Sequence, residues 1–157
     1  TDAPMGPVDL GPLVQGVLVV TAGAVRDSGG SVEVGPLPVV HGDEGSLFGV
    51  MQNLVTNALK FARPDAPPLV RIDAARAGDR WVISVSDNGI GVPEQYRERV
   101  FRMFQRLHAR EQYPGSGIGL AICRKVVALH GGEIWVDDTP DGGATFRFSL
   151  PDPTGDQ

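Results

Sequence analysis

The sequence is short of several features that would place it in a particular class of protein. It has a single cysteine, Cys123, so no internal disulfide can form and a reduced, cytoplasmic setting is expected. No apolar run approaches the roughly 20 residues that a membrane span needs, and no secretory signal opens the chain, so no membrane contact is expected. The formal net charge of −5 argues against a nucleic-acid partner.

What the chain does have is the length and the patterning of one α/β domain. Its 157 residues are enough to bury a core. Apolar residues at helical spacing predict three main helices, at residues 8–28, 43–61 and 121–129, and a shorter polar helix at residues 94–104. Alternating or β-branched segments predict one or two short strands within 31–40, then a hairpin and two further strands, at 69–75, 81–86, 133–137 and 145–150.

The stretch from Ser86 to Pro93 is the first candidate for chemistry. Asp87 ends a strand-like run and is followed by Gly89 and Gly91, with one residue between them. Glycine lacks the Cβ that would hold a ligand away from the backbone, so the arrangement suits a flat or phosphorylated ligand. An ordinary surface turn is the alternative, because Asp-Asn-Gly is also good turn chemistry.

The predicted helix over residues 43–61, with Asp43 as its N-cap, carries a second candidate set. Asn53, Asn57 and Lys60 follow one another at steps of four and three, so they lie along one flank of the apolar stripe. An amide oxygen can bind Mg²⁺, and a lysine supplies positive charge for a phosphate. The alternative is a solvated helix edge with incidental amides.

Glycines also open the predicted helix at 121–129. Residues 105–117 lack periodicity, which suits either a mobile lid or an ordinary long loop, and the run 115–120 reads Gly-Ser-Gly-Ile-Gly-Leu. Glycines at a helix start leave unpaired backbone N–H groups where an anion can sit. The run matches neither the P-loop nor the dinucleotide-binding fingerprint, so a phosphate site here would be of another kind.

Taken together, four stretches resemble the ATP-binding catalytic domain of sensor histidine kinases, within the GHKL superfamily. The similarity to its N, G1, F and G2 boxes lies at residues 53–61, 87–91, 101–104 and 115–120. It extends from about Val8 to Pro151, and the amino-acid sequence around the predicted lid is similar to that of the phytochrome-like branch. The resemblance implies an α/β fold: a two-layer sandwich with a mixed sheet packed under three main helices.

The resemblance also implies a site for ATP and Mg²⁺. Asp87 would accept a hydrogen bond from the adenine amino group, and Asn57 would hold Mg²⁺ between the phosphates. Asn53 and Lys60 would lie beside Asn57 and complete the catalytic group. The other nucleotide-binding positions would approach the base, ribose or phosphates: Gly89, Gly91, Gly115, Ser116, Gly117, Ile118, Gly119, Leu120 and Thr145.

One position of that site favours a kinase over an ATPase. Gyrase-type and chaperone-type relatives carry a glutamate that activates water where this chain has Asn53. An amide has no useful basicity, so transfer to a stronger nucleophile than water is expected. None of His41, His108 and His130 lies in a segment like the family's phosphoacceptor helix. The acceptor histidine is therefore expected on a separate domain.

The expected domain organisation follows from this. Residues 1–7 would be an extended lead-in from an upstream dimerisation domain, 8–151 the catalytic domain, and 152–157 a polar tail. The expected partners are the histidine-containing dimerisation domain of the same kinase and a downstream response regulator, with a dimer expected only for the full-length protein. Two alternatives stay open: a degenerate nucleotide-binding module without catalysis, and a serine kinase of the anti-sigma-factor type.

Overall fold

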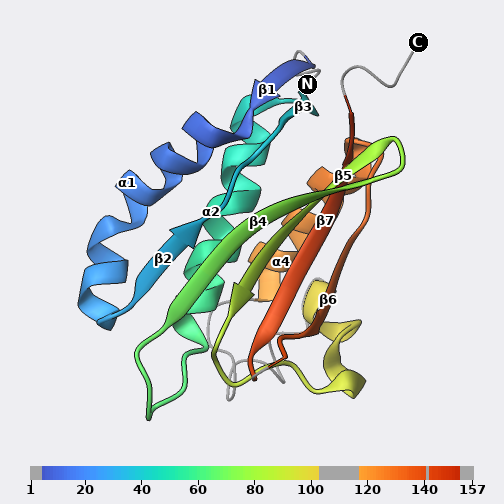
Figure 1. Cartoon of the computed structure of the whole chain (residues 1–157). Helices are drawn as coiled ribbons and strands as arrows, with labels where there is room; N and C mark the ends of the chain where they lie inside the picture. Colours follow the sequence, from blue (N-terminus) through green and yellow to red (C-terminus); the bar gives the residue numbers. More distant parts are fainter. Residues whose placement is uncertain (1–4, 103–116, 141, 153–157) are drawn as a thin grey trace.

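A computed structural model describes residues 5–102, 117–140 and 142–152 (Figure 1). Its main sheet has five strands, in the order β2 (Ser31–Val34), β4 (Leu69–Ala77), β5 (Arg80–Asp87), β7 (Ala144–Pro151) and β6 (Ile134–Asp138). β2 runs parallel to β4, and the other neighbouring pairs are antiparallel, so the sheet is mixed. The hairpin of β4 and β5 turns at Gly78, whose φ of +66° suits glycine.

The helices of the described residues cover one face of this sheet (Figure 1). They are α1 (Leu10–Ser28), α2 (Glu44–Lys60) and α4 (Gly117–Leu129). The predicted two-layer α/β sandwich with a mixed sheet under three main helices is therefore confirmed. None of these helices is long and apolar enough to cross a bilayer.

Side-chain caps fix where two of the helices begin. The Asp9 carboxylate accepts a hydrogen bond from Gly11 N–H, and the Asp43 carboxylate accepts one from Ser46 N–H. Each cap satisfies a donor that the first helical turn leaves unpaired. α1 ends at Gly29 in the left-handed conformation, as its Ser-Gly-Gly sequence predicts.

A second, two-stranded sheet joins the lead-in to the chain before α2. β1 (Gly6–Asp9) pairs antiparallel with β3 (Val39–Gly42). The segment 31–40 thus contains two short strands that belong to different sheets, rather than one broken strand. His41 lies in β3 with its side chain exposed.

The core lies between the main sheet and the helices. Alternate residues of β5 and β7 point into it: Ile83, Val85, Phe146, Phe148 and Leu150. The helices contribute Leu47, Val50, Met51, Leu54, Cys123 and Val127. Cys123 is fully buried, and this burial raises the pKa of its thiol to about 12, so the cysteine is a side chain of the core.

The prediction of a helix over residues 94–104 is wrong for residues 94–102, which the structure describes. Two 3-10 turns stand there, η1 (Glu94–Tyr96) and η2 (Arg99–Phe101), and Arg102 is extended. Arg97 reaches Asp138, at 2.7 Å, while Phe101 packs edge-on against Phe146. These anchors on neighbouring strands hold the segment, because a helix this short gains little from its own hydrogen bonds. Residues 103–104 lie outside the described residues.

Candidate functional site

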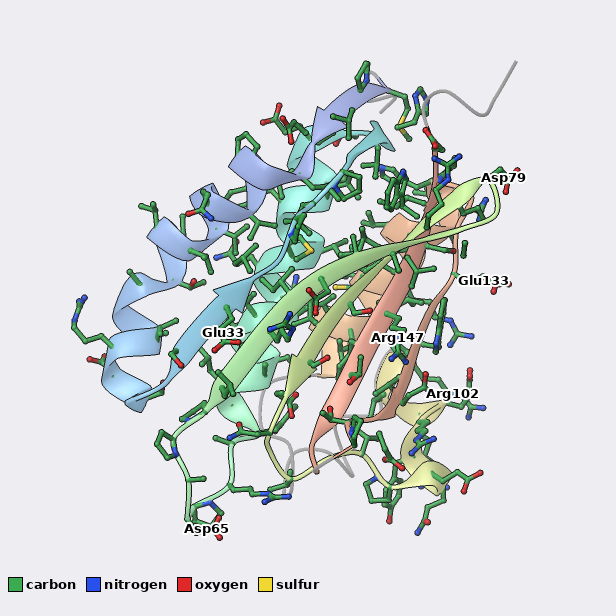
Figure 2. The ribbon with its side chains drawn as sticks, in the orientation of Figure 1. Glu33, Asp65, Asp79, Arg102, Glu133 and Arg147 are labelled. Carbon is green, nitrogen blue, oxygen red and sulfur yellow. The ribbon has the colours of Figure 1, made fainter. Side chains whose placement is uncertain are left out.

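The candidate site lies where β5 ends. This is the end of the sheet where Asp65 marks the loop after α2, and Asp79 marks the opposite end (Figure 2). Ile83, Val85 and Asp87 alternate along β5 and are all buried, so Asp87 is the last residue of the strand to face the helices.

One oxygen of the Asp87 carboxylate is fixed and the other is available. Oδ1 accepts hydrogen bonds from Gly89 N–H at 2.9 Å and from Ala144 N–H at 3.1 Å. Oδ2 makes no hydrogen bond within the described residues, although the side chain is only 6% exposed. Burial raises the pKa of this carboxyl, against the opposing effect of the two N–H groups. The geometry presents a single acceptor oxygen to a ligand.

Glycines let the backbone close around this carboxylate. A Cβ at Gly89 would overlap the carbonyl oxygen of Phe61, which ends α2, and a Cβ at Gly143 would overlap the carbonyl oxygen of Asp87. Gly91 has a φ of +79°, a conformation that favours glycine. The loop after β5 therefore packs directly on the end of α2, and Ile90 N–H donates to Phe61 O at 2.9 Å.

The three predicted side chains of α2 differ in their exposure. Asn57 is 5% exposed, Asn53 is half-buried and Lys60 is exposed. The Asn53 amide donates to Gly49 O at 2.9 Å, whereas the Asn57 amide makes no hydrogen bond within the described residues. Asn57 therefore offers a polar group to a ligand from a site that is almost closed to solvent.

The start of α4 lies against α2 at Asn53. A Cβ at Gly119 would stand 2.7 Å from Asn53 Oδ1, so glycine permits this close approach. Gly117 and Gly119 belong to the first turn of α4, not to a segment before the helix, and Leu120 is buried. Of the other predicted positions, Gly115 and Ser116 lie outside the described residues, as do the side chain of Ile118 and most of the predicted lid.

Thr145 does not face the site. Its hydroxyl donates to Ser86 Oγ at 3.1 Å and lies 2.9 Å from Thr139 Oγ1, on the face of the sheet opposite to Asp87. The prediction that Thr145 supports the adenine end is corrected accordingly. Ala144 contacts Asp87 instead, through its backbone N–H. Only the glycine pair before residue 144 hints at this close approach, and a pair of glycines in a turn is a weak signal.

α2 thus joins the parts of the candidate site. Its second half contacts the loop after Asp87 at Phe61 and the start of α4 at Asn53. Among the described residues, no group of three or more His, Cys, Asp or Glu side chains could hold a metal ion. A buried carboxylate, an amide with no partner among the described residues and a helix that opens with glycines are the parts of a candidate nucleotide site in an α/β sandwich domain.

Residues 42–154 match the family described as histidine kinase-, DNA gyrase B-, and HSP90-like ATPase. The chain belongs to this family, which confirms the resemblance found in the sequence.

Individual relatives and solved structures agree with this family assignment. The chain is 47% identical over 127 residues to the phytochrome-like protein Cph1 of Synechocystis sp., which covers 81% of this chain and only 17% of that protein. The fold matches full-length ShkA in complex with AMPPNP with a TM-score of 0.81 and 31% identity, over 96% of this chain and 32% of that one. It matches the mycobacterial sensor histidine kinase MprB with a TM-score of 0.79 and 32% identity, over 94% and 97% of the two chains.

Proposed function

We propose that this chain is the catalytic domain of a two-component sensor histidine kinase. In this proposal it binds Mg·ATP and transfers the γ-phosphoryl group to a histidine on a separate dimerisation domain, from which a response regulator then receives it. The family of the chain and the names of its relatives support the proposal. The observation that carries it is the Asp87 carboxylate, with one oxygen held by two backbone N–H groups and the other available.

An adenine amino group suits this carboxylate oxygen, because a carboxylate is an acceptor only. The glycines at 89 and 91 let the loop after β5 pack closely on Phe61 and Gly143, and this packing holds the carboxylate in place for a base. In the complex of full-length ShkA, the bound molecule is AMPPNP, an ATP analogue, and the similarity between the two folds supports ATP as the ligand here. We assign the base to the Asp87 end of the site and the phosphates to the end between α2 and α4.

Asn57 is the residue that would hold Mg²⁺. Its amide has no hydrogen-bond partner within the described residues, so its oxygen could bind the ion, while phosphate oxygens and water would supply the other ligands. When bound, the ion would neutralise charge on the phosphates. Lys60, one turn later, would add a positive charge, and the N-terminal N–H groups of α4 would face the same phosphates.

Asn53 supports phosphoryl transfer over hydrolysis. Its Nδ2 is bound to Gly49 O, and its Oδ1 faces Gly119. An amide fixed in this way can orient a neighbour but cannot take a proton from water. The chain's own contribution would therefore be to position ATP and stabilise charge while the acceptor histidine supplies the nucleophile.

The test is transfer of labelled phosphate. The chain is mixed with ATP labelled at the γ-phosphate and a separately expressed dimerisation domain that carries an acceptor histidine. We expect label on that domain that is labile to acid and stable to base. Asp87→Asn should abolish the signal, while Asp73→Asn, which removes a carboxylate from an exposed ion pair of β4, should retain it.

Two results would contradict the proposal. Acid-stable label would indicate a serine kinase instead. Nucleotide binding without label on any acceptor domain would indicate a non-catalytic module.

A further inference from the structure

One peptide unit next to Asp87 is held at both of its ends. The N–H of the Gly89–Ile90 peptide unit donates to Phe61 O at 2.9 Å, and its C=O accepts from Arg63 Nε at 3.2 Å. Both partners belong to the short segment that follows α2. The end of this helix and the loop after β5 are therefore joined through a single peptide group.

This peptide unit needs such support because it follows a glycine. Gly89 has no Cβ to restrict rotation, so the unit could turn and redirect both its C=O and its N–H. The N–H of Gly89 itself donates to Asp87 Oδ1. A change in the glycine's backbone would therefore alter one of the two bonds that set the direction of the Asp87 carboxylate.

Arg63 spans the space between two loops of the candidate site. Its guanidinium lies against Gly142, where a Cβ would overlap Nη2, so the arginine also touches the turn between β6 and β7. Two residues later, Ala144 N–H makes the second bond to Asp87 Oδ1. Arg63 thus contacts both loops whose N–H groups hold the carboxylate.

The surroundings of Arg63 allow its side chain to be shortened without harm to the core. Its side chain is exposed, and together with Ser28, Leu59 and the loop 64–68 it lines a cavity of about 590 Å³ outside the core. Within the part of the chain that the structure describes, Arg63 makes no ion pair and no contact with an aromatic ring. A loss of function on substitution can therefore be separated from a loss of folding.

We propose that Arg63 is a positioning residue for the base end of the nucleotide: its Nε–H fixes the Gly89–Ile90 peptide and, through Gly89, the Asp87 carboxylate. This inference rests on the proposed binding of Mg·ATP. Two other roles make different predictions. A direct charge on the phosphates requires a cation at position 63, and a purely structural role affects the whole domain equally.

The substitutions that separate these roles are Arg63→Ala, Arg63→Gln and Arg63→Lys. Glutamine places an N–H donor at the same position along the side chain as arginine Nε but carries no charge, whereas lysine keeps the charge and has a methylene there. Arg71→Ala is the control, because it removes an exposed guanidinium whose partners are Glu33 and Asp73.

Two readouts test the proposal. In the nucleotide-free protein, Arg63→Ala and Arg63→Lys should speed hydrogen exchange at the Ile90 amide about fivefold relative to core amides, which corresponds to the net contribution of one hydrogen bond. By calorimetry, Arg63→Ala and Arg63→Lys should each lower the affinity for adenosine, ADP and Mg·ATP by the same factor, also about fivefold. Arg63→Gln and Arg71→Ala should behave like the wild type, and in Arg63→Ala and Arg63→Lys the unfolding equilibrium should shift by no more than the same fivefold factor.

Each contrary result has a separate meaning. A loss that grows with the number of phosphates and is restored by lysine would overturn the positioning role in favour of a direct charge. Unchanged exchange and affinity in Arg63→Ala, or a uniform rise in exchange with a lower midpoint, would also overturn it. If the wild type itself fails to bind Mg·ATP, the proposed function fails, while Ile90 exchange still tests the contact.

Discussion

Asp87→Asn is the substitution that best separates ligand binding from folding. Asparagine has nearly the same shape, and its Oδ1 can keep the two hydrogen bonds from Gly89 N–H and Ala144 N–H. The second oxygen, which makes no hydrogen bond within the described residues, becomes an NH₂ group. In the proposed complex this change sets one donor against another, the adenine amino group.

The expected loss can be worked out from these groups. A hydrogen bond to a charged acceptor contributes about 1.5–3 kcal/mol, and a donor left unpaired in a buried site costs about 1–3 kcal/mol. The sum of about 2.5–6 kcal/mol corresponds to a rise of roughly seventyfold to twenty-thousandfold in Kd for Mg·ATP. Titration calorimetry measures this change, with Asp73→Asn as the matched control on an exposed strand position.

Whereas Asp87→Asn should lower the affinity for Mg·ATP, it should raise the free energy of unfolding relative to the wild type as the pH increases. Because burial raises the pKa of Asp87 in the folded protein, the folded state binds more protons than the unfolded state from about pH 4 upward. Stability contributed by the protonated carboxyl is therefore lost as the pH rises through the folded pKa. Asp87→Asn lacks this titration, so its unfolding free energy relative to the wild type should increase with pH over the same range.

The two measurements together can refute the reasoning. A Kd within threefold of the wild type would show that Asp87 does not contact the base. A variant that binds weakly but is also less stable than the wild type at neutral pH would show that the carboxylate supports the fold, so the lost affinity would not report a direct contact.

Three further substitutions or probes test other parts of the structure. Gly89→Ala sets a Cβ against the carbonyl that ends α2 and should cost about 1–3 kcal/mol of unfolding free energy in urea, whereas Gly49→Ala, in open space on the same helix, should gain up to about 1 kcal/mol. His130→Ala removes a buried ring that bonds to α2 and should cost about 2–4 kcal/mol in thermal unfolding, while His41→Ala, on an exposed side chain, should cost under about 0.5 kcal/mol. Because burial raises the pKa of Cys123 to about 12, its thiol should react with a disulfide reagent at pH 8 only after denaturant is added; rapid reaction in the native protein would contradict this burial.

Local signals in the sequence predicted most of the elements. Asp9 and Asp43 are short acceptors that cap α1 and α2, and Gly29 ends α1 in the conformation that glycine favours. Phe146, Phe148 and Leu150 alternate in the predicted strand 145–150, a pattern that indicates one face packed on the core, and all three are buried in β7. These predictions succeed because each depends on residues within a few positions of one another.

The errors arise where contacts between distant segments decide the outcome. The turns at 94–101 replace a helix because Phe101 packs on Phe146, a partner far along the chain. Thr145 was assigned to the site from the resemblance to the family, but the pairing of its strand with β5 turns its side chain away from Asp87. Likewise, nothing in the local pattern connects Arg63 with Gly89, because the contact requires the end of α2 to meet the end of β5.

α2 and α4, between which we place the phosphates, contact each other at two separate points. The first turn of α4 contacts α2 at Asn53. The other end of α4 contacts the start of α2 through His130. There, His130 Nε2 accepts from Asp43 N–H at 3.0 Å, and Nδ1 lies 2.8 Å from Val126 O. The ring therefore accepts from one helix while it donates to the other. Because α2 is also tied to the Asp87 loop at Phe61, movement of α4 relative to the base end must strain one of these contacts.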